Sequence, residues 1–128
     1  MQIFKPGFRI STLDYIVLVL GAIASIGALQ IDVAIAVVIA FTVGHFFLFC
    51  NVVRMNRTYE LIWATGFLSL AGATIYGIIA SWWVCYGVTI LMTCVLVALQ
   101  LKRPDYHGAF WQKINPNLPD WWENKFPK

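Results

Sequence analysis

Four long apolar stretches, separated by short polar interruptions, make up most of the chain as far as Leu101. A helix that crosses the hydrocarbon core of a bilayer needs about 20 consecutive apolar residues. Each stretch has roughly that length, so the pattern predicts an all-α membrane protein with four transmembrane helices. The predicted helices cover residues 12–29, 33–53, 59–79 and 82–101.

Residues that cap helix N-termini stand immediately before each apolar stretch. Ser, Thr and Asp side chains accept hydrogen bonds from the unpaired N–H groups of the first turn. A proline cannot continue a helix, so Pro104 is expected to close the fourth one. The agreement between caps and apolar stretches strengthens the four-helix prediction. The predicted N-caps are Ser11, Asp32, Thr58 and Ser81.

These boundaries divide the chain into a transmembrane domain at residues 1–103 and a polar tail at residues 104–128. The first apolar stretch follows Lys5 and Arg9, as in a signal peptide. It merges into the second stretch after a short break, however, so we expect a retained helix. The connections around residues 30–32 and 80–81 are very short, which predicts two tight antiparallel hairpins.

The positions of the basic residues set the predicted orientation. The chain has 9 Lys and Arg against 6 Asp and Glu, a formal net charge of +3. Every Lys and Arg lies within residues 5–9, 54–57 or 102–128, which fall on one side of a four-helix topology. The positive-inside rule then predicts a multi-pass protein of the cell inner (plasma) membrane, with both termini cytoplasmic.

Composition narrows the expected partners. Hydrophobic residues make up 60% of the chain and charged residues 12%, which is typical of a membrane protein. The basic residues form no dense face, so we expect the lipid bilayer and other membrane protein subunits, or a second copy, as partners and no nucleic acid. Cys50, Cys85 and Cys94 have no CxxC spacing, and we expect no disulfide framework, metal or cofactor.

Polar residues gather where the second predicted helix ends and the third begins. Asn51 and Arg54 are three residues apart, a spacing that places them on one helix face. Glu60 opens the next helix. Arg54 could extend toward the headgroups and pair with Glu60, a purely structural arrangement. Alternatively, Asn51, Arg54 and Glu60 form a candidate cytoplasmic-side site for a lipid headgroup or an anionic substrate.

His45 lies about 18 Å into the second helix at 1.5 Å per residue, close to mid-bilayer. Ionisable groups at this depth usually face the interior of a bundle. The helical spacing groups His45 with Phe41 and Phe49, away from Arg54. Thr93 and Cys94 are predicted at the same depth on the fourth helix, as candidate polar contacts. A hydrogen-bonded structural histidine, a proton or substrate contact and a metal ligand remain alternatives, although two ligands are too few for zinc.

Small residues recur at helical spacing and predict close helix packing. These candidate packing positions could face neighbours in the same chain or a second subunit. They are Gly21, Ser25, Ser69, Ala73 and Gly77.

The tail combines aromatic and basic residues, which favour the headgroup layer of a membrane. We expect an irregular segment on the cytoplasmic membrane surface, because prolines interrupt it. It could also dock another protein through Trp111, Trp121 and Trp122.

No catalytic motif is present in the sequence, so we expect no enzyme. The pattern favours a small, non-catalytic accessory or structural subunit that associates with other membrane proteins. The alternative is a small homo-oligomeric transporter or channel with His45 lining the path. A transport path normally needs several inward polar groups or broken helices, which favours the first interpretation.

Overall fold

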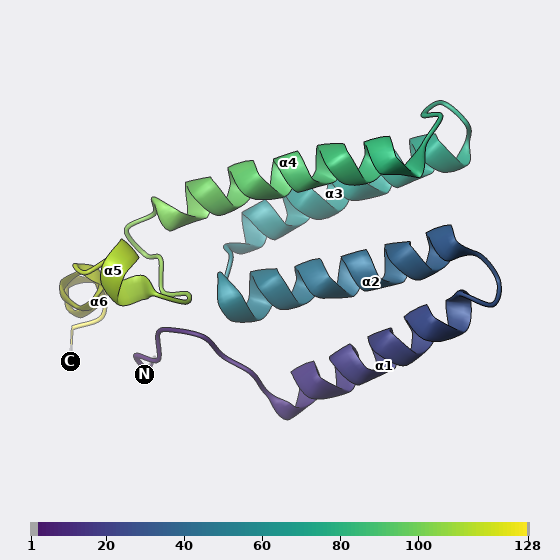
Figure 1. The fold of residues 1–128 in the computed structure, drawn as a ribbon. Coiled ribbons are helices and arrows are strands. Elements are labelled where there is room, and N and C mark those ends of the chain that lie inside the picture. The colour runs from purple at the N-terminus through teal and green to yellow at the C-terminus, as the bar shows by residue number, and fades with distance from the viewer. Residues whose placement is uncertain (1–2, 128) are drawn as a thin grey trace.

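The computed structural model describes residues 3–127, which are helical over most of their length and contain no strand. Four long helices lie side by side, and two short ones sit beyond one end of them (Figure 1). The segments before α1 and after α4 both lie at that end. The elements are α1 (Thr12–Ala28), α2 (Val33–Phe47), a π-helical turn η1 (Leu48–Val52), α3 (Arg57–Ile75), α4 (Trp82–Leu101), α5 (Trp111–Ile114) and α6 (Leu118–Lys125).

Three of the four predicted N-caps are confirmed: Ser11, Asp32 and Ser81. Ser11 and Asp14 form a reciprocal capping box, in which each side chain accepts a hydrogen bond from the backbone N–H of the other. The prediction of Thr58 as the third cap is wrong. Asn56 takes that role by accepting a 2.9 Å hydrogen bond from the Thr58 N–H, so α3 begins at Arg57.

The end of α3 also differs from the prediction, because the helix stops at Ile75 rather than at residue 79. Gly77 has a φ of +77°, the left-handed conformation that glycine adopts at helix C-termini. The Ile78 N–H donates to the Ala73 carbonyl at 2.8 Å, and the Gly77 N–H donates to the Thr74 carbonyl at 3.1 Å. This pair of bonds closes the helix, so Gly77 terminates α3 and is not part of a packing face.

Two segments are long and apolar enough to cross a membrane, Val33–Val52 and Trp82–Leu101, and Thr12–Ala28 is a shorter apolar helix. The distribution of side chains on α4 is the reverse of that in a soluble protein. The helix buries the polar residues Thr89, Thr93 and Gln100, whereas Leu91 and Val95 on its outer side are more than half exposed. Exposed apolar and buried polar side chains suit a lipid surrounding, and these observations support a membrane location.

Helix α2 lies between α1 and the α3–α4 pair. Gly21 on α1 allows close approach, because a Cβ atom there would come within 2.9 Å of Val43 on α2. The Ser25 hydroxyl donates to the Ala36 carbonyl of α2 at 2.8 Å. Gly21 and Ser25 thus pack two helices of the same chain, as small residues commonly do in membranes.

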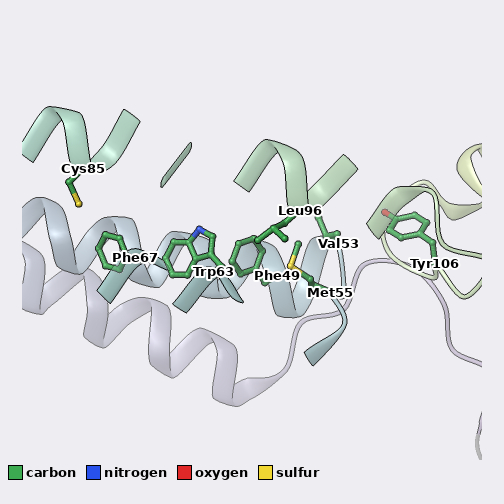
Figure 2. Packing of buried hydrophobic residues seen from close by; sticks show 8 residues of the cluster. All are labelled: Phe49, Val53, Met55, Trp63, Phe67, Cys85, Leu96 and Tyr106. Atoms are coloured by element: carbon green, nitrogen blue, oxygen red, sulfur yellow. The ribbon is translucent and has the colours of Figure 1, made fainter. Parts of the chain in front are cut away.

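The opposite side of α2 packs on α3 and α4 through a row of aromatic and aliphatic side chains. Figure 2 shows this core extending along the helices, from Cys85 and Phe67 past Trp63 to Leu96. The buried members of the cluster are Phe49, Val53, Met55, Trp63, Phe67, Cys85, Leu96 and Tyr106.

The expectation of an irregular tail is wrong, because the tail contains α5 and α6 and is tied to the ends of the long helices. Tyr106 and Leu118 are almost fully buried. The Ala109 N–H donates to the Val52 carbonyl at 2.7 Å, and the Gly7 N–H donates to the His107 carbonyl at 2.7 Å. These contacts join segments that are far apart in the sequence.

Candidate functional site

The polar site begins at η1, where the helical hydrogen bonding changes. The Val53 N–H donates to the Leu48 carbonyl, five residues earlier, and this wider turn ends the second long helix. Such π-turns frequently occur at functional sites. Asn51 within the turn is 1% exposed and donates to the Arg9 carbonyl at 2.7 Å. In the described part of the chain, its Oδ1 atom has no hydrogen-bond partner.

Arg54 follows η1 in a left-handed conformation, with a φ of +49°. This conformation is uncommon for a residue with a side chain and turns the chain out of the helix. The expected helix face shared by Asn51 and Arg54 therefore does not form. The Arg54 guanidinium instead donates to the Lys5 carbonyl, in the segment that precedes α1.

A cavity of about 400 Å³ opens at this end of the molecule, where residues preceding α1, the α2–α3 connection and the tail meet. Arg54 and Glu60 line it, whereas Asn51 is not among the lining residues and holds the backbone of Arg9. The charged and titratable side chains in the wall are Arg9, Cys50, Arg54, Arg57, Glu60, Asp105 and His107.

The two carboxylates of the cavity already have cationic partners. Glu60, which is partly buried, lies 3.7 Å from the exposed Arg57 and not against Arg54 as the sequence suggested. Asp105 accepts two hydrogen bonds from Arg103, at 2.8 and 3.0 Å, and these bonds hold the pKa of Asp105 below its usual value. Within residues 3–127, no carboxylate lies within ion-pairing distance of Arg9 or Arg54.

The electrostatic surroundings of Arg54 reflect this excess of positive charge. Partial burial of its guanidinium lowers the pKa of Arg54, and the nearby charge of Arg9 lowers it further. Both effects disfavour the cationic form, so an anion in the cavity would relieve them. The arrangement can therefore bind a negatively charged group.

His45, the second candidate, lies inside an aromatic stack and away from the polar cavity. Its ring is 4.8 Å from the Trp63 ring and 4.3 Å from the Phe41 ring, between centroids. The Nδ1 atom lies 2.8 Å from the Phe41 carbonyl, so Nδ1 carries the proton if the ring is neutral. The predicted grouping of His45 with Phe41 and Phe49 is confirmed.

Thr93 and Cys94 do not meet His45 in the described structure. Thr93 accepts a 2.9 Å hydrogen bond from the Trp63 indole N–H and donates its hydroxyl proton to the Thr89 carbonyl. Cys94 is exposed on α4. Among residues 3–127, no group of three or more His, Cys, Asp or Glu side chains could hold a metal ion.

Comparison of the chain with models of protein families, with curated protein sequences and with solved structures finds no match.

The remaining candidate residues fall into two groups. Ser69 is exposed on α3, where its hydroxyl bonds back to the Thr65 carbonyl at 2.8 Å, and Ala73 is partly buried. Trp111 and Trp122 pack against Phe4, with ring centroids 6.0 and 5.3 Å away, so part of their surface is covered by the chain itself. Trp121 lies under the Lys125 ammonium, 5.2 Å from its ring centroid.

Among the charged residues and histidines of the cavity wall, the sequence did not predict Arg9, Arg57, Asp105 and His107. Their clustering depends on bonds between the first residues, η1 and the tail, which no local pattern reveals. The sequence does show that every Lys and Arg falls in segments predicted at one end of the helices. That pattern does not show which of these residues come into contact.

Proposed function

We propose that the chain is a small polytopic membrane protein with a non-catalytic, accessory or structural role. In this proposal its four long helices cross the inner membrane as two antiparallel hairpins, with the tail and both termini in the cytoplasm. It associates through its helices with other membrane proteins or with itself.

The reversed pattern of α4 supports the transmembrane arrangement. Thr89 and Thr93 are buried and their hydroxyls bond to carbonyls one turn earlier, at 2.7 and 2.9 Å. Large apolar side chains point outward from α1 as well, and Leu13, Ile23 and Ile26 are each more than 60% exposed. Water would penalise so much apolar surface, whereas lipid tails accept it.

The connections support the same topology. In Figure 1 the α1–α2 and α3–α4 turns lie at one end of the helices, and the tail lies at the other. The two turns, at residues 29–32 and 76–81, contain no Lys or Arg, whereas the opposite end carries the basic residues. This is the charge distribution that the positive-inside rule associates with a cytoplasmic face.

The observation that carries the accessory role is the unpacked outer face of α3. Ser69 and Thr65 are exposed there, and a Cβ added at Gly72 would meet nothing within 4 Å. These residues lie on the side of α3 opposite the buried Trp63 and Phe67. Small residues on a membrane helix permit close backbone approach of another helix, and no other helix of the described chain occupies this face.

The surroundings of His45 favour this role over a transport path. Its ring is held between Phe41 and Trp63, and its Nδ1–H is satisfied by the carbonyl of its own helix. A path through the helices would require further polar groups facing the same space. The nearest polar pair, Trp63 and Thr93, is already hydrogen-bonded.

Native mass spectrometry after gentle extraction from the source membrane tests the proposal. We expect the wild-type chain to emerge in a complex of fixed stoichiometry, and Ser69→Leu to lose that complex. Ala98→Leu, which adds similar bulk to the exposed side of α4, is the matched control and should keep it.

A wild-type chain that is extracted as a monomer would contradict the association. A pure homo-oligomer that Ser69→Leu disrupts would identify the partner as a second copy. For such a homo-oligomer, the transporter alternative makes a further prediction. Loss of transport across the membrane in His45→Phe, with the abundance of the protein unchanged, would support that alternative.

A further inference from the structure

The proposed association does not use the cavity at the end of the helices. Its wall contains three arginines and two carboxylates, together with His107. Arg57 is paired with Glu60, and Asp105 is paired with Arg103, which stands outside the wall. Arg9 and Arg54 are the cationic side chains of the described cavity wall that form no ion pair.

Asp14, on the first turn of α1, lies near enough to Arg9 for their charges to attract, but it forms no ion pair with Arg9 or Arg54. The Ser11 backbone N–H donates to its Oδ2 atom at 2.6 Å, and the Ser11 hydroxyl donates to the same atom at 2.7 Å. These bonds commit the carboxylate to the helix cap. Among the described residues, Arg9 and Arg54 therefore present about two positive charges without an ion pair.

Both arginines are held in place by the backbone around them. The Arg9 N–H donates to the Asn51 carbonyl at 3.2 Å, and the Asn51 side chain returns a bond to the Arg9 carbonyl. Arg54 is fixed by its left-handed turn and by its bond to Lys5. Only one of the five guanidinium N–H groups of Arg54 is used in that bond, so others remain available.

We propose that this cavity binds a phosphate group, held by the guanidinium groups of Arg9 and Arg54. A phosphate diester carries one negative charge and a monoester about 1.5 to 2, which matches the charge of the two arginines. The planar fork of arginine donates paired hydrogen bonds to phosphate oxygens. His107 borders the same space, but its Nδ1 faces the Asp105 carbonyl at 2.8 Å, so a neutral ring offers the phosphate no donor and the two arginines supply the hydrogen bonds.

Two sources could supply this phosphate: a lipid headgroup or a soluble phosphate compound. A headgroup is compatible with the position of the cavity at the end of the apolar helices. The experiment therefore uses two probes, phosphatidic acid and inorganic phosphate, on the full-length chain in detergent. Native mass spectrometry measures retained phosphatidic acid, and isothermal titration calorimetry measures inorganic phosphate.

Arg9→Gln is the informative variant, because the Arg9 side chain takes part in no hydrogen bond within the described structure and only its backbone supports the fold. Lys113→Gln removes an exposed cation of α5 outside the cavity and is the matched control. Arg9→Lys keeps the charge without the paired donors. Thermal unfolding of each variant checks that the chain remains folded.

We expect Arg9→Gln to weaken binding of the recognised probe by about tenfold or more, as for the loss of a charged hydrogen-bond donor, with Arg9→Lys intermediate. Lys113→Gln should bind as the wild type does. Loss confined to phosphatidic acid would identify a headgroup site, whereas loss of inorganic phosphate binding would identify a soluble phosphate compound.

Absence of binding of both probes to the folded wild-type chain would overturn the proposal. Equal binding by wild type and Arg9→Gln would also overturn it, as would an equal loss in Lys113→Gln.

Discussion

The imidazole ring of His45 is stacked on the indole ring of Trp63, with their centroids 4.8 Å apart and their planes inclined by 21°. The contact joins α2 to α3, and the Trp63 indole N–H donates a hydrogen bond to Thr93 on α4. His45 is thus a member of the aromatic interior that connects three helices.

Replacement of His45 should affect stability according to the ring that remains. His45→Phe keeps an aromatic ring on Trp63 and should lower the free energy of unfolding by no more than about 1 kcal/mol, through the lost hydrogen bond. His45→Ala also removes the packing and should cost about 2–4 kcal/mol. Thermal or denaturant unfolding in detergent measures both changes. An equal loss in the two variants would contradict the stacking role.

Close approach of α1 and α2 at Gly21 gives a prediction with a control on the same helix. Gly21→Ala places a Cβ atom 2.9 Å from Val43, so the helices must separate, at a cost of about 1–3 kcal/mol. Gly27→Ala meets nothing within 4 Å and should be neutral or slightly stabilising. Unfolding in detergent compares the two variants. Equal stabilities would show that α1 does not pack on α2 as described.

Gly108 fixes the tail against the end of the second helix. A Cβ atom there would lie 2.5 Å from the Val53 carbonyl oxygen, a backbone atom that cannot easily move. Gly108→Ala should therefore detach the tail, and limited digestion with trypsin should cut after Lys102 several times faster. Gly44→Ala, where nothing lies within 4 Å, is the control. Unchanged cleavage in Gly108→Ala would contradict the docked tail.

The Asp105–Arg103 pair makes the stability of the folded chain sensitive to acid. The Arg103 hydrogen bonds lower the pKa of Asp105 relative to the unfolded chain, where it is about 3.9. The stabilisation is therefore present above about pH 4 and is lost as the pH falls through the lower pKa of the folded state. Both side chains are about one-third exposed, so the contribution should be below about 1 kcal/mol.

Thermal unfolding at a series of pH values tests this dependence. Asp105→Asn should unfold at a lower temperature than wild type above pH 4, and the difference should shrink on acidification. Asp120→Asn, an exposed carboxylate of α6, should keep the wild-type acid dependence. A difference between Asp105→Asn and wild type that is independent of pH would contradict this account.

The elements that the sequence predicted well are those with local causes. Ser11, Asp32 and Ser81 each precede an apolar run, and a cap is a contact between neighbours in the chain. Gly77 carried a local signal too, since glycine after a helical run indicates a C-terminus. The small residues before it share its spacing, however, and that spacing predicts a packing face.

The candidate site could be predicted only in part. Arg54 and Glu60 are candidates from the sequence because they are polar residues next to the end of an apolar run. The π-turn at Asn51 and the positive φ of Arg54 have no local sequence signature, and together they change which face each side chain occupies. Arg9 and His107 reach the cavity through bonds between distant segments, such as that of Gly7 to His107.

The central claim is that the chain crosses the membrane four times with its basic end in the cytoplasm. Reporter fusions that distinguish the two sides of the membrane test this claim most directly. Fusions would be made at Gln30, at Ala80 and after Pro127, in the two helix connections and the tail. The account predicts that the Gln30 and Ala80 fusions report the outer side and the Pro127 fusion reports the cytoplasm. A Gln30 or Ala80 fusion on the same side as Pro127 would contradict it.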